Sequence, residues 1–412
     1  MQHNIVSHLF RAALMSTALA STLSACGGGG DGGADTPSKS EATITLGGAQ
    51  SQTLAGGKAL ALTTSASDNS AVAWTLAAGA VGSLSATSGA GVNYVPPAAV
   101  AANTQVTVTA TAAGVSRSVI LTVFPDPGPA GLSIISGRLD PDSLEPETDG
   151  PLAAARFRES RQVTSDLGGN LYVAGTCRLT QTQRLGLSLR KIGTDNVVGT
   201  LASCAQHTWF GKADTDGNTG KVSIPRGVAA DRAGNLYVAT YFDATAGGAS
   251  AGTRAVFKIT PYGAMTVFAG ATGAHTADLV DGKGAAARFL TPEIAGIDAD
   301  DNLYLLDKDG AVVRKVTPAG EVGTIAALPA SLSADQNGNT YRVDNGAGTI
   351  VQTGPTGAER VIANVRALPG ALAMMTPQAY GLVRTGPASY ALIVSNGRTF
   401  GNEAIVKLVT PK

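Results

Sequence analysis

Short stretches in which apolar and polar residues alternate fill residues 42–125, and Gly, Ser and Asn residues separate them. The alternation is clearest at 105–110 (QVTVTA) and 118–123 (SVILTV), where every second side chain is apolar. A strand that is buried on one face produces this period of two. The pattern therefore predicts an all-β domain over 42–125, with Trp74 of the strand-like segment 71–76 in its core.

The order of motifs in this domain resembles that of bacterial immunoglobulin-like domains. A strand that contains Trp74 is followed by a turn at 82–85 (GSLS), by Tyr94 with Pro96 and Pro97, and by two closing strands. The resemblance implies a β-sandwich in which Trp74 anchors the core. The next residues, 126–131, begin with Asp-Pro-Gly-Pro and are expected to form a semi-rigid hinge.

A corner motif recurs through the remainder of the chain, with the form Asp-x-x-x-Asn followed two residues later by Tyr. The Asp side chain can cap such a turn while Gly or Asn takes a positive φ. We therefore expect these aspartates to be structural. The copies occupy 166–172, 231–237, 298–304 and 335–341, and a degenerate fifth copy contains Arg384 and Tyr390.

Two further elements recur in the same order around this corner. One is an apolar strand that ends in Lys-x-x-Pro-x-Gly, as at 256–263 and 313–320, and another strand follows it. The other precedes the first strand and reads Asp-Gly-x-x-Ala-Ala-Ala-Arg-Phe, at 149–157 and 281–289. We call it the Asp-Gly element. Each unit therefore holds four antiparallel strands, named a to d in chain order.

Together these three elements resemble the NHL-repeat family of β-propellers. The resemblance covers 132–412 and implies five blades, with six as the alternative. The chain ends in a strand c at 404–409 and has no strand d to follow it. Residues 132–137 form a leftover strand at the start of the region, so we expect them to pair with 404–409 and close the ring.

The strand order also predicts where long connections lie. The a–b and c–d corners share one face of a propeller, and the b–c and d–a connections share the other. Loops on a rigid scaffold are where binding residues concentrate, so this second face, the loop face, is the expected binding surface. Its long connections are 176–186, 241–253, 138–160, 203–223 and 270–291.

The first residues of the chain predict export. Residues 1–25 combine a weakly basic start with an apolar run that is too short for a permanent span, as in a signal peptide. The segment ends in Leu-Ser-Ala before Cys26, which resembles the lipobox of bacterial lipoproteins and implies lipidation of Cys26. An ordinary secretory signal is the alternative. Residues 26–41 form a Gly-rich flexible linker, and Gly27 favours the outer membrane by the same resemblance.

Two other cysteines, Cys177 and Cys204, remain in an oxidising compartment. A disulfide between them is expected there, with two buried free thiols as the alternative. The bridge would fix the start of the connection 203–223.

The connection 203–223 carries the most distinctive candidate binding residues. His207, Trp209 and Phe210 could stack on a sugar or anchor a protein, or the two aromatic rings could pack the loop onto its own sheet. His275 belongs to another connection of the loop face. The alternating oxygen ligands Asp214, Asp216 and Asn218 suggest Ca²⁺, although the Gly and Glu of an EF-hand loop are missing.

Composition narrows the classes of function. The chain has 30 Lys+Arg against 30 Asp+Glu, so it lacks the basic surplus that nucleic-acid binding requires. No catalytic motif for metalloproteases, serine hydrolases or nucleotide binding is present. We therefore expect an exported, lipid-anchored protein that binds a protein or glycan partner, touches the membrane through its lipid only and needs no cofactor. The alternatives are a Ca- or Zn-dependent lyase or lactonase, and a purely structural envelope protein.

Overall fold

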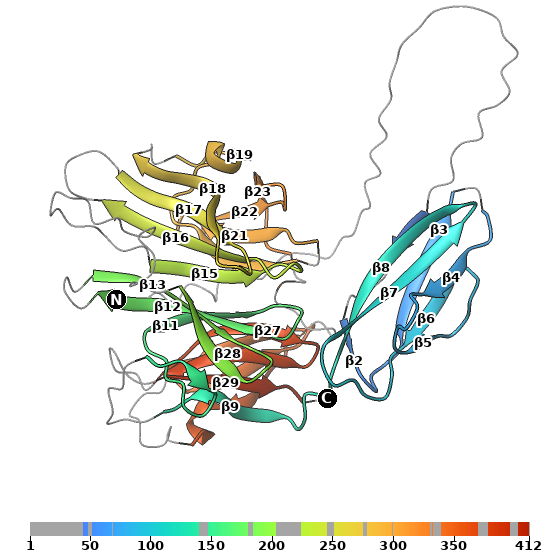
Figure 1. The fold of residues 1–412 in the computed structure, drawn as a ribbon, viewed down its shortest axis with the longest axis horizontal. Coiled ribbons are helices and arrows are strands. Elements are labelled where there is room, and N and C mark those ends of the chain that lie inside the picture. Colours follow the sequence, from blue (N-terminus) through green and yellow to red (C-terminus); the bar gives the residue numbers. More distant parts are fainter. Residues whose placement is uncertain are drawn as a thin grey trace, which may run out of the picture.

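The computed structural model describes residues 44–47, 52–67, 69–139, 147–179, 184–202, 224–244, 251–274, 278–298, 300–329, 332, 339–369, 378–395 and 403–411. Apart from short 3-10 turns, the elements in this part of the chain are all β-strands, as the alternation predicts. Figure 1 shows a narrow two-sheet domain beside a larger group of sheets. No helix among the described residues is long and apolar enough to cross a bilayer.

The narrow domain is a sandwich of two four-stranded sheets. Both sheets contribute to one apolar core, which includes Leu62, Tyr94, Val108 and Leu121. Trp74 is 1% exposed at its centre and donates from Nε1 to the Gly89 carbonyl at 2.8 Å, so its expected role as a core anchor is confirmed. The sheets are β1 (Ile44–Gly47), β3 (Leu60–Ala66), β6 (Gly91–Val95) and β5 (Ser83–Leu84), and β2 (Gln52–Leu54), β8 (Val115–Phe124), β7 (Thr104–Ala112) and β4 (Ala73–Leu76).

The larger domain has five antiparallel sheets in its described residues, and we number them I to V. Sheet I holds β11 (Ser160–Ser165), β12 (Leu171–Leu179), β13 (Arg184–Ile192) and β14 (Val197–Ala202). Sheet II holds β15 (Ile224–Ala230), β16 (Leu236–Ala244), β17 (Ala251–Ile259) and β18 (Met265–Ala274). Sheet III holds β20 (Glu293–Ile297), β21 (Leu303–Asp307), β22 (Val312–Val316) and β23 (Glu321–Ile325).

Sheets IV and V depart from this plan in opposite ways. Sheet IV shows β24 (Thr340–Asp344), β25 (Thr349–Thr353) and β26 (Glu359–Asn364), which correspond to strands b to d, and its strand a falls outside the described residues. Sheet V holds β27 (Gln378–Gly386), β28 (Ser389–Ser395) and β29 (Glu403–Val409), and its fourth strand is β9 (Gly131–Gly137).

The pairing of β9 with β29 confirms the predicted closure of the region. The two strands run antiparallel, with Leu132 opposite Leu408 and Ile134 opposite Val406. Val406 and Leu408 are fully buried, so the first strand of the domain completes the core of its last sheet. The strand starts at Gly131, and the predicted hinge is therefore one residue shorter than expected.

Alternating side chains pack the sheets against each other in succession. In β12, Tyr172 and Ala174 join a core shared with sheet II, whereas Val173 joins a core shared with sheet V. In β16, Val238 faces sheet I and Tyr237 faces sheet III. Sheets IV and V share a further core, so described contacts join the sheets in the order III, II, I, V and IV. Sheets that pack face to face in such a series, with a terminal strand completing one of them, are characteristic of a β-propeller.

The repeated corners have the structural role that their sequence predicts. Asp166 accepts hydrogen bonds from the Asn170 backbone at 2.9 Å, the Asn170 side chain at 2.7 Å and the Tyr172 hydroxyl at 2.9 Å. Burial raises the pKa of Tyr172, and the neighbouring carboxylate adds to the rise. The same bonds recur in two other corners, made by Asp231, Asn235 and Tyr237 and by Asp298, Asn302 and Tyr304.

Two connections assigned to the loop face, 138–160 and 270–291, are placed differently in part. Their segments 147–157 and 278–289 run along the outer edge of the following sheet as far as its c–d corner. There β10 (Gly150–Pro151) pairs with β14, and β19 (Gly282–Lys283) pairs with β23. The sequence reasoning was wrong here because it treated everything between strands d and a as loop. The Asp-Gly element instead supplies a fifth edge strand.

Candidate functional site

The residues that the sequence singles out for binding lie almost entirely outside the described part of the chain. For Cys177, the structure describes the backbone, which lies in β12 opposite Gly186. The Cys177–Cys204 disulfide, the lipid at Cys26 and the loop-face residues therefore remain predictions. The candidates outside the described residues are Cys26, Cys204, His207, Trp209, Phe210, Asp214, Asp216, Asn218 and His275.

The described strands fix the direction of the loop face. Every a–b and c–d corner between them has two to five residues, such as 166–170 and 193–196. The b–c and d–a connections emerge at the opposite ends of the same strands, and 203–223 is among the longest. The predicted long b–c connections 176–186 and 241–253 were wrong in their bounds, because the paired strands continue and leave only 180–183 and 245–250 between them. Within the described residues, no group of three or more His, Cys, Asp or Glu side chains is placed to hold a metal ion.

A buried arginine organises each Asp-Gly element. Arg190 of β13 is 1% exposed and binds the Asp149 carboxylate at 2.7 Å, and it also donates to the carbonyls of Thr148 and Arg156. Its guanidinium lies 4.5 Å from the ring centre of Phe157, which is buried between sheets V and I. The segment 147–157 therefore fills the space between sheets V and I, and we call it a plug.

The second copy of this plug is built in the same way in sheet III. Arg314 of β22 binds Asp281 at 2.8 Å and lies 5.3 Å from the ring centre of Phe289. Arg314 also lies 3.6 Å from Asp307, and neither side chain is exposed to solvent. Charged groups so deeply buried must be compensated locally. The carboxylates of this cluster are paired with Arg314, so we assign the cluster a structural role and not a ligand-binding one.

We expect Asp281→Asn to change the pH dependence of stability. Burial alone would raise the pKa of Asp281, but hydrogen bonds from Thr324 and the charge of Arg314 hold it below its ordinary 3.8. Ionised Asp281 therefore stabilises the fold above about pH 4, and this contribution is lost as the pH falls through its lowered pKa. Urea unfolding should separate the variant from the parent at pH 7 and less so at pH 3. An equal difference at both pH values would contradict the assignment.

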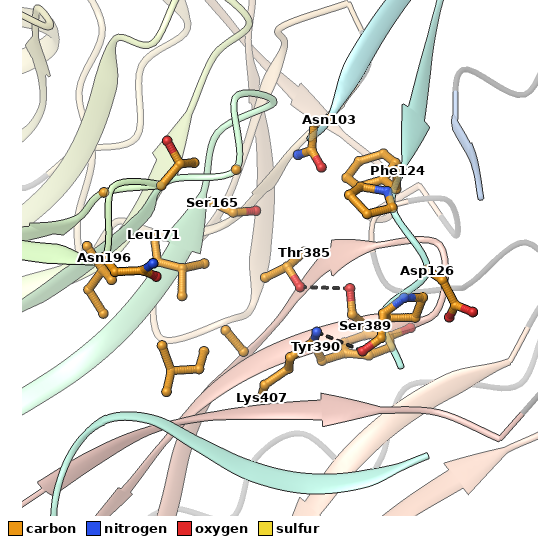
Figure 2. Close-up of a pocket in the computed structure, with 18 of the residues that line it drawn as sticks. Asn103, Phe124, Asp126, Ser165, Leu171, Asn196, Thr385, Ser389, Tyr390 and Lys407 are labelled. Atoms are coloured by element: carbon orange, nitrogen blue, oxygen red, sulfur yellow. Dashed lines mark hydrogen bonds between the residues drawn. The ribbon is translucent and has the colours of Figure 1, made fainter. Parts of the chain in front are cut away.

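A cavity lined by described residues lies where the sandwich meets the propeller. Its volume is about 330 Å³, at the lower end of the size of small-molecule sites. Its walls come from the sandwich, from the hinge, and from the tight-corner side of sheets V and I (Figure 2). The cavity is therefore on the opposite side of the propeller from the predicted loop face.

Direct contacts hold the sandwich in place around this cavity. Asn103, in the loop before β7, donates from Nδ2 to the Leu167 carbonyl in the a–b corner of sheet I at 3.1 Å. Phe124, at the end of β8, lies against Gly386 in sheet V, where a methyl group would approach its ring to 3.1 Å. The sandwich is thus seated on two corners of the propeller.

Lys407 is the central charged group of the cavity. Its ammonium donates to the Pro127 carbonyl of the hinge at 2.9 Å and so ties sheet V to the hinge. Burial lowers the pKa of Lys407, and the nearby Asp126 carboxylate opposes that effect. The two opposite charges leave the cavity without a strong net charge.

A signal for this site is present in the sequence of the fifth repeat. In the strand pairings, Lys407 occupies the position that Arg190 and Arg314 hold in sheets I and III. The a–b corner of sheet V is only 387–388, shorter than the Asp-x-x-x-Asn corners. The degenerate fifth repeat therefore departs from the pattern where the sandwich docks and the cavity opens.

Comparisons with known proteins give the chain no family. No protein-family model matches it, and neither does any curated protein sequence. Among solved structures, it is similar to virginiamycin B lyase from Staphylococcus aureus, at 11% identity over 90% of this chain and 100% of the other, with a TM-score of 0.26.

Two Bacteroides structures are similar to the same degree. One is a protein of unknown function from Bacteroides thetaiotaomicron, with 15% identity over 90% of this chain and 98% of that chain and a TM-score of 0.27. The other is a DUF4623 family protein from Bacteroides eggerthii, with 10% identity, coverages of 86% and 89%, and a TM-score of 0.29. Similarities this low assign no activity to the chain. The assignment of a propeller fold is based on the packing of the chain's own sheets.

Proposed function

We propose that this chain is an exported, lipid-anchored binding protein, in which an immunoglobulin-like stalk carries a five-bladed NHL-type propeller head. The observation that carries the binding role is the asymmetry of the head. Its described a–b and c–d corners are tight, whereas the connection 203–223 joins the loop-face ends of β14 and β15. The partner is a protein or a glycan, recognised on that face.

Five blades fit the lengths that separate the described sheets. A blade needs four strands, and a strand averages about 5–6 residues. The gap 326–339 between β23 and β24 must already supply strand a and the corner of sheet IV. The gap 203–223 between β14 and β15 is shorter than four strands with their turns. The lengths of both gaps therefore favour five blades over six.

The aspartates of the repeated motifs in the head support a binding role over catalysis. Asp166, Asp231 and Asp298 are held by their own corners, and Asp149 and Asp281 by the buried arginines. These groups are committed to structure and are not poised for proton transfer. The proposal therefore places recognition in the connections that vary between the blades.

A deletion tests the loop face directly. Replacing 205–222 with a short Gly-Ser linker is expected to abolish capture of the native partner from the cell envelope while the head stays folded. Tyr262→Ala is the matched control, since Tyr262 is 98% exposed on a tight c–d corner of the opposite face. Capture that survives the deletion would reject the loop face. An absence of any specific partner for the parent protein would favour a purely structural role.

The lipid anchor has a separate test. Cys26→Ser should abolish incorporation of labelled palmitate and release the protein from the membrane fraction into the soluble one, because stable anchoring depends on the acyl chains. Mass spectrometry of the mature N-terminus checks the same claim. An unmodified Cys26 in the membrane-extracted parent protein would contradict it.

A further inference from the structure

We propose that the cavity between the sandwich, the hinge and sheets V and I binds a neutral saccharide of one or two sugar units. The proposal concerns a different surface from the loop face and does not depend on it. Three observations carry it: the chemistry of the lining, the balance of its charges and the orientation of some of its polar groups.

The lining is rich in uncharged groups that both donate and accept hydrogen bonds. Amide and hydroxyl side chains have this double capacity, and a sugar hydroxyl has the same one. Apolar side chains such as Leu54, Leu152 and Ile192 complete the walls and can contact the C–H faces of a sugar ring. The uncharged polar residues of the lining are Asn103, Ser165, Thr194, Asn196, Thr385, Ser389 and Tyr390.

The charges in the lining favour a neutral ligand. Lys407 of β29 is the cation of the cavity and Asp126 of the hinge is its anion. A phosphate or polyanion would meet one lysine and a carboxylate, and a divalent cation would meet one carboxylate and a lysine. Neither arrangement resembles a built site for ions, because such sites gather several groups of opposite charge.

Some of the polar groups are already oriented. Thr385 and Ser389 share a hydrogen bond of 3.1 Å across the short corner of sheet V, and Figure 2 shows both side chains at the cavity beside Tyr390 and Lys407. Lys407 uses one of its three protons on Pro127, so the described contacts leave donors for a ligand. Oriented donors reduce the cost of ordering side chains on binding.

Saturation-transfer NMR on the full mature chain in detergent tests the proposal. The probes are glucose, N-acetylglucosamine and maltose, with gluconate as an anionic and glucosamine as a cationic comparison. Transfer to at least one neutral sugar, and weaker transfer to the charged ones, is the expected result. Absence of transfer to all three neutral sugars, or preference for a charged one, would overturn the proposal.

Two variants locate the binding. Thr194 lines the cavity, so Thr194→Trp should fill part of it and abolish binding. Asn196→Gly removes an amide while keeping the positive φ of 63° accessible. The second change should weaken binding about tenfold, the upper range for one lost hydrogen bond. Ala319→Trp, on the same type of corner in sheet III, is the control and should bind like the parent. Equal binding by Thr194→Trp, with an unchanged melting temperature, would exclude the cavity.

Discussion

Replacing Arg314 with alanine is expected to lower the free energy of unfolding of the propeller by about 3–5 kcal/mol, the usual cost of removing one partner from a buried ion pair. The change leaves Asp307 fully buried without its counter-charge and frees Asp281 and the carbonyls of Val280 and Arg288. It also removes the cation beside Phe289. Urea unfolding followed by tryptophan and tyrosine fluorescence measures the loss.

Arg342→Ala is the matched control for that prediction. Arg342 of β24 pairs with Glu359 at 3.0 Å, but both side chains are about half exposed. Exposed pairs contribute about 0–1 kcal/mol, so this variant should unfold close to the parent. If both variants lose the same small amount, Arg314 does not anchor the plug between sheets II and III. Arg314→Met keeps more of the packing and should fall between the two.

Replacing Gly131–Gly137 with a Gly-Ser segment of equal length is expected to abolish cooperative folding of the propeller. The replacement removes Leu132 and Ile134 from sheet V and exposes Val406 and Leu408, which are fully buried. Burying one such side chain contributes about 1.5–3 kcal/mol, and four together approach the 5–15 kcal/mol that holds a typical domain folded. Calorimetry should show the propeller transition lost and the sandwich transition kept.

The outer strand of sheet IV provides the comparison. β26 (Glu359–Asn364) is an edge strand whose side chains are mostly exposed, with Val361 at 60%. The same Gly-Ser replacement there should lower the transition temperature without abolishing the transition. If the β9 replacement also only lowers the transition temperature, β9 is a dispensable edge strand and does not close the ring.

The features that sequence predicted correctly depend on local chemistry or on counting strands. The Asp166–Asn170–Tyr172 corner was predictable because all of its partners lie within seven residues. The pairing of β9 with β29 followed from a last unit that lacks strand d and a first strand that lacks a sheet. Trp74 likewise sat in an alternating strand whose burial the period of two implied.

The missed features depend on contacts between distant segments. The motif around Asp149 and Asp281 was visible, but its partners Arg190 and Arg314 lie on another strand and share no spacing with it that one sequence reveals. The cavity required knowing that Asn103 of the sandwich would reach Leu167 of the propeller. Surfaces that meet between domains carry no hydrophobic period, so the pattern along the chain did not indicate them.

Amide hydrogen exchange of the full mature chain tests the central claim, a ring of sheets that β9 completes. In the structure, 131–137 form the edge strand of sheet V, and their alternate amides donate to β29 across an antiparallel ladder. Those alternate amides should be protected to an extent comparable with the amides of 403–409. Both segments should lose protection together in the Val406→Asp variant, because Val406 is buried opposite Ile134. Exchange of 131–137 at the rate of an unstructured peptide, beside a protected 403–409, would contradict the closed propeller.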